Sequence, residues 1–250
     1  MEAQLLMGER LDEVNDHLSL IQKEEGMTFG TDALLLASFV RPCPQGTAIE
    51  FGAGSGIVSL LCASRQKFAH ITAVEVQQEY ADLCERNISL NGLQDKITTT
   101  HADIRDLSAY APLGDVHAVF ANPPYMTTES GYAAKDQGRQ AARHEAHGSI
   151  KDFCLCAKKK LRWGGSFYVV WRPDRLVDLF CAMREAEIEP KKITFVIATP
   201  HAAPSMVLVE GKRGGKPSLV STPFLCLKNE DGSPTKEMER LLLNGTFPFS

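Results

Sequence analysis

The stretch TAIEFGAGSGIVSLLC, residues 47–62, decides the fold of this chain. Its first five residues predict a buried strand, and its last six have the periodicity of a helix. The two are joined by Gly52, Gly54 and Gly56, which allow the backbone to approach a ligand closely where a helix begins. The dinucleotide fingerprint G-x-G-x-x-G requires a further glycine where this chain has Ile57, so an NAD site is disfavoured.

The alternation of strands and helices continues towards the C-terminus. Runs that predict strands follow at residues 71–76, 97–101, 116–121, 166–171, 193–198 and 206–210. Helical periodicity is found at 77–90, 149–161 and 175–187. The last two strands lie close together, which favours antiparallel pairing. The sequence therefore predicts an α/β fold: a Rossmann-like, seven-stranded, mostly parallel sheet with the last strand antiparallel and helices on both faces.

The two ends of the chain are less regular. An edge strand is expected at 18–22, and Thr31 with Asp32 is expected to cap a helix over 33–40. The tail contains an apolar stretch at 219–227 and a helical pattern near 235–243. We expect a single domain over residues 1–250, made of an entry segment (1–45), a core (46–212) and a C-terminal tail (213–250).

The composition limits the classes of function. The formal net charge of the 250 residues is −4, so binding to nucleic acid would require a local basic surface. No segment is apolar enough to span a bilayer and the N-terminus lacks a signal-peptide layout, so we expect a cytoplasmic protein without a membrane partner. The seven cysteines do not resemble a disulfide framework, and Cys154 and Cys156 lack a second pair at zinc-site spacing, so no metal is expected.

Polar residues stand at the carboxyl ends of consecutive predicted strands. Glu50, Glu75, Asp103 and Asn122 share this position, where open α/β sheets form their ligand crevice. A carboxylate at Glu75 can accept hydrogen bonds from both hydroxyls of a ribose, and Asp103 can meet the exocyclic amine of an adenine. In isolation each is equally an ordinary surface acid.

The segment Asn122-Pro123-Pro124-Tyr125 ends the fourth strand. Two consecutive prolines cannot continue a ladder, because neither offers an N–H. The Asn122 side-chain oxygen, the Pro123 carbonyl and the Tyr125 ring can together grip a planar group that carries an NH2, as a nucleobase or an amide does. Alone, the segment is also compatible with an ordinary proline turn.

Several stretches together resemble a known family. They are GMTFGTDALLLASFV, EFGAGSGIVSLL, FANPPY, AARHE, RPDRL and APSMVLVEGKRGG, which span most of residues 5–215. The array resembles class I S-adenosylmethionine-dependent methyltransferases and, more narrowly, the bacterial tRNA(Val) adenine-37 N6-methyltransferase family. The resemblance implies S-adenosylmethionine as the cofactor and tRNA as the partner. No obligate protein partner is evident.

The resemblance also implies roles for individual residues. Glu50, Gly52, Gly54 and Gly56 would cradle the methionine part of the cofactor, Glu75 its ribose, and Asp103 with Ile104 its adenine. Thr31 and Asp32 match the family's N-terminal cofactor segment. Asn122 would lie beside the cofactor and, with Pro123 and Tyr125, form the catalytic set.

Basic residues are sorted by the end of the sheet at which they are expected. Those at the crevice edge are predicted to contact RNA phosphates: Arg139, Arg143, His144, Arg172, Arg175 and His201. Lys158, Lys159 and Lys160 should lie at the opposite end, where they favour the dipole of their helix C-terminus.

Three alternatives remain open. A protein glutamine N5-methyltransferase also resembles an NPPY enzyme, but that family carries a helical domain before the glycine motif, and only about 45 residues precede it here. A ribosomal RNA guanine-N2 methyltransferase is the second. A non-catalytic RNA-binding module on a methyltransferase scaffold is the third, and the intact glycines, acids and NPPY argue against it.

Overall fold

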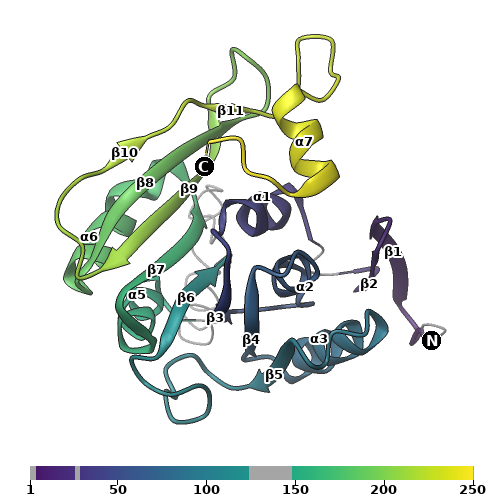
Figure 1. Ribbon diagram of the computed structural model, residues 1–250. Coiled ribbons are helices and arrows are strands. Elements are labelled where there is room, and N and C mark those ends of the chain that lie inside the picture. The colour runs from purple at the N-terminus through teal and green to yellow at the C-terminus, as the bar shows by residue number, and fades with distance from the viewer. Residues whose placement is uncertain (1–3, 26–28, 124–147, 250) are drawn as a thin grey trace, which may run out of the picture.

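The computed structural model describes residues 4–25, 29–123 and 148–249. Within these ranges the chain forms a nine-stranded sheet in the order β10-β8-β9-β7-β6-β3-β4-β5, with β11 paired to β8 off this path (Figure 1). The long strands are β3 (Cys43–Phe51), β4 (Phe68–Glu75), β5 (Ile97–His101), β6 (Val116–Ala121), β7 (Leu161–Trp171), β8 (Ile188–Ile197) and β9 (Pro204–Arg213).

The strand directions agree with the predicted fold. β5, β4, β3, β6 and β7 pair in parallel, whereas β9 is antiparallel to both β7 and β8. The seven-stranded, mostly parallel sheet with a reversed last strand is therefore confirmed. Two short strands from the tail, β10 (Val220–Ser221) and β11 (Leu225–Cys226), pair with β8 in parallel and widen the sheet.

Helices cover both faces of the sheet (Figure 1). They are α1 (Thr31–Phe39), α2 (Ile57–Ser64), α3 (Gln78–Leu90), α5 (Ile150–Lys160), α6 (Leu176–Glu185) and α7 (Lys236–Asn244), with a 3-10 turn η1 (Pro173–Arg175). Alternate side chains of the strands enter two separate cores: Phe120 packs with α1 and α2, and Val119 packs with α5 and α6. This period-two alternation explains why the strands are apolar throughout.

The N-terminal residues form a hairpin of their own, β1 (Glu9–Asn15) and β2 (Leu18–Lys23), separate from the large sheet. The strand expected at 18–22 is present, but its partner is β1, which the sequence did not predict. The hairpin is held to α3 by Asn91, whose Oδ1 accepts from the Ser19 amide at 3.0 Å and whose Nδ2 donates to the Ser19 carbonyl at 2.8 Å.

The start of α1 differs from the expectation. The helix begins at Thr31, its N-cap is Gly30, and no side chain forms a cap hydrogen bond. The predicted capping by Thr31 and Asp32 is therefore wrong, since both residues lie inside the first turn. The far end of α1 is closed by buried Lys67, whose Nζ donates to the carbonyls of Ala37 at 2.7 Å and Val40 at 2.5 Å.

The tail packs against the same face as α1. Thr235 caps α7 by accepting from the Met238 amide at 3.2 Å. Beyond α7, the Phe247 ring meets Phe39 of α1 edge-on with their centroids 5.0 Å apart. None of the helices described is long and apolar enough to cross a membrane.

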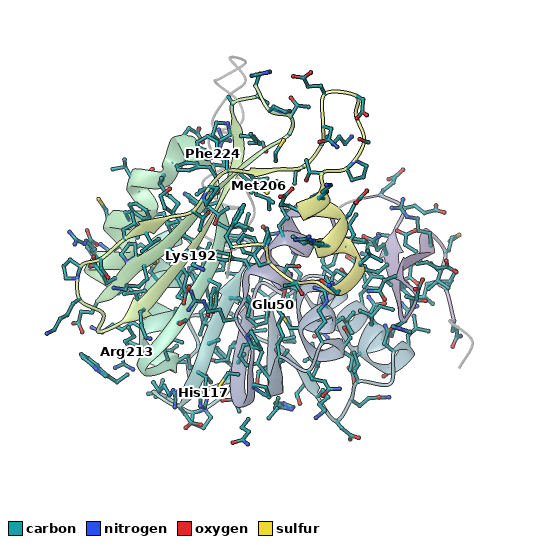
Figure 2. The ribbon with its side chains drawn as sticks, turned by 45° about the horizontal axis from the view of Figure 1, so that its top comes forward. Glu50, His117, Lys192, Met206, Arg213 and Phe224 are labelled. Atoms are coloured by element: carbon teal, nitrogen blue, oxygen red, sulfur yellow. The ribbon has the colours of Figure 1, made fainter. Side chains whose placement is uncertain are left out.

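One lysine of the predicted basic cluster is not at the surface. Lys160 is fully buried, and its Nζ donates to the carbonyls of Leu107, Tyr110 and Ala111. It therefore fastens the loop after β5 to the end of α5, whereas a general attraction to the helix dipole was expected. Figure 2 marks this end of the sheet by His117 and Arg213, opposite Met206 and Phe224.

Candidate active site

The carboxyl ends of four neighbouring parallel strands form one edge of the sheet. Phe51 of β3 pairs with Val74 of β4 on one side and with Ala121 of β6 on the other, while Glu75 pairs with His101 of β5. From β3 the chain first adds β4 and β5 on one side of the sheet and then adds β6 and β7 on the other side. The order of the strands therefore reverses between β3 and β6. Such switch points are where open α/β sheets bind ligands.

The glycine loop follows β3 and turns against β4. The amides of Gly52 and Ala53 both donate to the Val74 carbonyl, at 2.9 Å and 3.0 Å. Gly52 and Gly54 have φ values of +69° and +55°, and a Cβ at either position would meet no atom within 4 Å. Open space beside the backbone of two glycines allows a ligand to contact the main chain directly.

The third glycine serves packing. Gly56 is the N-cap of α2 with φ +85°, and a Cβ there would come within 2.6 Å of the Cys84 sulfur. Gly56, having no side chain, forms no cap hydrogen bond to α2. The loop therefore offers an open backbone cradle next to a helix N-terminus, which is suited to a polar or charged ligand group.

Glu75 closes the side of this cradle. Its side chain is buried at the end of β4, where Oε2 accepts from the Gly54 amide and Oε1 from the Gln77 amide, both at 2.9 Å. Each carboxylate oxygen has further acceptor capacity. The two hydrogen bonds fix the carboxylate in place, and its remaining acceptor sites suit a pair of hydroxyl groups.

Glu50 lies below the loop, in the interior of the molecule (Figure 2). Its Oε2 accepts from the Ser59 amide at 3.0 Å and from the Ser59 hydroxyl, which ties β3 to α2. Burial raises the pKa of Glu50 to about 8. The structure thus shows Glu50 bracing the start of α2, and its predicted place in the cradle for the cofactor stays a prediction.

Asp103 and Ile104 follow β5, and the Asp103 carboxylate is already engaged. It accepts from the Arg105 amide at 2.8 Å and from Arg105 Nε at 2.9 Å and 3.0 Å, and these hydrogen bonds lower the pKa of Asp103. Ile104 is buried, and its carbonyl accepts from the Tyr110 hydroxyl. The pair forms a preorganised wall beyond Glu75.

Asn122 comes directly after β6, across the crevice from these acids. Its Nδ2 donates to Asp32 Oδ2 at 2.8 Å, which joins the end of β6 to the first turn of α1. Its Oδ1 is buried and has no hydrogen-bond partner among the described residues. Buried polar atoms are nearly always paired, so this oxygen has acceptor capacity that none of the described residues uses. Pro123, which follows, is buried as well.

The described members of the predicted RNA-binding set lie near the carboxyl end of β7 and the start of β9. Arg172 pairs with Asp174 at 2.6 Å, Arg175 pairs with Asp178, and exposed His201 lies 3.4 Å from Glu230. Arg172 and Asp174, with Pro173, Pro204 and Ser205, line a hollow of about 450 Å³. Four predicted residues lie outside the described ranges: Tyr125, Arg139, Arg143 and His144.

Two residues support the site without having been predicted. Ser59 holds Glu50, and Asn87 of α3 donates to the carbonyls of Ser55 and Ile21, both at 3.0 Å, while its Oδ1 accepts from the Ile21 amide at 2.7 Å. Asn87 therefore fastens the glycine loop to β2. A buried asparagine in the apolar stripe of an amphipathic helix is the signal that reveals such a residue.

The amino-acid sequence matches a known protein family and several named relatives. Residues 24–186 match a family model described as the methyltransferase small domain. A tRNA1(Val) (adenine(37)-N6)-methyltransferase of Porphyromonas gingivalis is 27% identical over 190 residues, 74% of either chain. The protein of that name from Shewanella sediminis is 23% identical over 233 residues, which cover 89% of this chain and 93% of the relative. The protein of that name from Shewanella amazonensis is 37% identical over 131 residues, which cover 52% of this chain and 54% of the relative.

Solved structures share the fold. A predicted O-methyltransferase from Agrobacterium tumefaciens superposes with a TM-score of 0.71 at 22% identity, covering 86% of this chain and 97% of that one. A tRNA (m1A58) methyltransferase from Aquifex aeolicus gives 0.56 at 14% identity, covering 78% and 73%. At these identities the likeness establishes the Rossmann-like methyltransferase fold that the sequence predicted.

Proposed function

The chain belongs to the methyltransferase small domain family, and on this basis we propose that it transfers a methyl group from S-adenosylmethionine to N6 of an adenine in tRNA. The relatives' names indicate adenine 37 of tRNA(Val) as the nucleotide. The observation that carries the proposal is the buried Asn122 Oδ1, which lacks a donor among the described residues and lies at the crevice edge beside the open glycine cradle.

The residues on the β3–β5 side fit the cofactor. Open space at Gly52 and Gly54 admits its methionine part, Glu75 is held where it can accept from two ribose hydroxyls, and Asp103 with Ile104 would contact its adenine. Thr31 and Asp32, in the first turn of α1, border the same crevice. When bound, S-adenosylmethionine supplies an electrophilic methyl group on a sulfonium.

The residues on the β6 side prepare the nucleophile. The lone pair of an adenine N6 is delocalised into the ring, which makes the amine a poor nucleophile. Asn122 Oδ1 and the Pro123 carbonyl would each accept one N6–H, and this favours a more pyramidal nitrogen aimed at the methyl group. The catalysis is therefore by position and electrostatics, and the proton can leave after transfer without a strong base.

The base must leave its stack to enter such a pocket. Tyr125 is proposed to stack on it, and the cations at the crevice edge are proposed to hold the flanking phosphates. Arg172, Arg175 and His201 each have an acidic neighbour. Exposed ion pairs contribute little, so a phosphate can displace the acid at small cost. Arg139, Arg143 and His144 complete the proposed set.

A methyl-transfer assay tests the proposal. The purified protein, S-adenosylmethionine and an unmodified tRNA(Val) transcript should yield N6-methyladenosine when the digested RNA is analysed by mass spectrometry. A transcript with guanine at position 37 is the matched control and should remain unmethylated. Methylation of a release-factor peptide, with no product on tRNA, would replace the RNA proposal with the glutamine alternative.

A further inference from the structure

Asp32 and Asn122 form a contact that the proposed chemistry does not by itself require. They stand far apart in the sequence, on α1 and after β6, yet Asn122 Nδ2 lies 2.8 Å from Asp32 Oδ2 in partly buried surroundings. The opposite end of the same amide, Oδ1, is buried without a partner among the described residues. The two ends of the amide are thus in unlike environments.

The hydrogen-bonding chemistry of Asp32 and Asn122 determines which end of the Asn122 amide faces Asp32. An ionised carboxylate has no proton to donate, so only the NH2 end of the amide can face Asp32 with a favourable interaction. The carbonyl end must then point the other way. With a neutral amide or a hydroxyl at position 32, the two orientations of Asn122 would be closer in energy.

Asp32 is itself held in position. It lies in the first turn of α1, where the helix dipole favours a negative charge. A Cβ at Gly30 would come within 2.8 Å of Asp32 Oδ1, whereas φ at Gly30 is −120°, which any residue adopts. A side chain at position 30 would therefore displace the end of the Asp32 carboxylate, whereas the backbone angle of Gly30 does not require glycine.

We propose that Asp32 is a positioning residue: it orients the Asn122 amide so that Oδ1 is presented to the substrate amine. This inference rests on the proposed function, because it assigns the Asn122 oxygen to an amine donor. It differs from the role that the family resemblance gives Asp32, which is contact with the cofactor.

Replacement of Asp32 separates the two roles. Asp32→Ala removes the acceptor, so kcat at saturating S-adenosylmethionine should fall about tenfold to a hundredfold. The cofactor Kd, measured by calorimetry, should change by less than about threefold. Asp32→Asn keeps an oxygen that can accept from Nδ2 and should lie between Asp32→Ala and wild type. Asp82→Asn makes the same substitution on the exposed surface of α3 and should leave kcat unchanged.

Exchange of the two side chains is a sharper test. Asn122→Asp alone sets two carboxylates against each other, which should lower kcat about a hundredfold. In Asn122→Asp/Asp32→Asn, the new amide at position 32 can donate to one oxygen of the new carboxylate and leave the other facing the substrate. The double variant should recover at least about tenfold over Asn122→Asp. A folded double variant without recovery would overturn the inference.

A readout independent of turnover completes the test. The side-chain amide protons of Asn122, observed by NMR with 15N labelling, should shift in Asp32→Ala towards those of a free amide and exchange faster with water. Unchanged signals, or a weakened cofactor Kd that accounts for the whole loss of activity, would overturn the inference. If wild type fails to methylate RNA, the proposed function falls while the NMR result still reports on the orientation.

Discussion

The two sides of the crevice differ in how their polar atoms are occupied. On the β4–β5 side, the carboxylates of Glu75 and Asp103 already accept hydrogen bonds from neighbouring backbone and from Arg105. On the β6 side, Asn122 Oδ1 is buried without a partner among the described residues. Carboxylates that already accept hydrogen bonds keep their positions without a ligand, whereas an oxygen that no described residue pairs has acceptor capacity left for a ligand. The side proposed to bind the cofactor is thus preorganised, and the side proposed to bind the substrate favours binding of a donor.

Asn122→Ala should have the largest effect and bears directly on this difference. Loss of the oxygen removes the acceptor for the amine, so kcat should fall by about 10²–10³. Cofactor affinity by calorimetry should be nearly unchanged, because the β4–β5 side is intact. Asn229→Ala, in an exposed turn of the tail, is the control. If the variant loses cofactor affinity but retains kcat, then Asn122 acts on the cofactor and the two sides of the crevice do not have separate roles.

Glu50→Gln tests the buried carboxyl group that ties β3 to α2 beneath the glycine loop. The pKa of Glu50 is raised from 4.5 to about 8, so the folded state keeps a proton that the unfolded state releases between these values. The stability that this group contributes is therefore present at low pH and lost as pH rises through the window. Glutamine does not titrate. Relative to wild type, the unfolding free energy of the variant should rise by about 3 kcal/mol as the pH goes from 5 to 8.

Urea unfolding at several pH values measures this difference. The side-chain oxygen that Glu50→Gln retains can still accept from Ser59, so the fold should be kept. A difference that stays constant from pH 5 to 8 would mean that Glu50 is ionised in the folded protein, contrary to the raised pKa.

Glu75→Gln should weaken the preorganised wall. One of the two carboxylate oxygens becomes an NH2 group that faces the amide of Gly54 or Gln77, so one backbone donor loses its acceptor. Cofactor affinity should fall about tenfold and the unfolding free energy by about 1–2 kcal/mol. Glu79→Gln, on the exposed surface of α3, is the matched control. An unaltered cofactor Kd would show that Glu75 does not contribute to cofactor binding.

Gly30→Ala should have the smallest effect. The new methyl group would push against Asp32 Oδ1, and the displaced carboxylate would hold Asn122 less well, so kcat should fall about fivefold. In an Asp32→Ala background the same change should cause no further loss, because the two act through one contact. Additive losses in steady-state kinetics would show that Gly30 acts by another route.

Much of this arrangement could be predicted from sequence because it depends on local pattern. The strands expected at 97–101 and 116–121 have the same bounds in the structure, since turn residues and prolines limit them sharply. The polar residues at strand ends could be placed at one edge because parallel strands share their direction. By contrast β1 carries charges throughout, ERLDEVN, and pairs only within a hairpin, so no apolar period reveals it.

The rest depends on contacts between residues remote in sequence. Asp32 in the first turn of a helix is also typical of helix capping, and nothing local to it indicates Asn122. Lys160 looks like a member of a surface lysine run, but it is buried because the loop carbonyls at 107–111 receive its charge. Glu50 could be placed at a strand end, but whether it faces the ligand or Ser59 depends on how α2 packs. Single-sequence patterns do not report such pairings.

The packing of Phe247 on Phe39 links the assembly of the site to the order of synthesis. The helix that carries Asp32 leaves the ribosome early, whereas the ring that covers its other end follows α7 and emerges after the rest of the core. Contacts between such distant segments form late in folding. A nascent chain would therefore hold its early helix incompletely packed until the residues from α7 to Phe247 have been made.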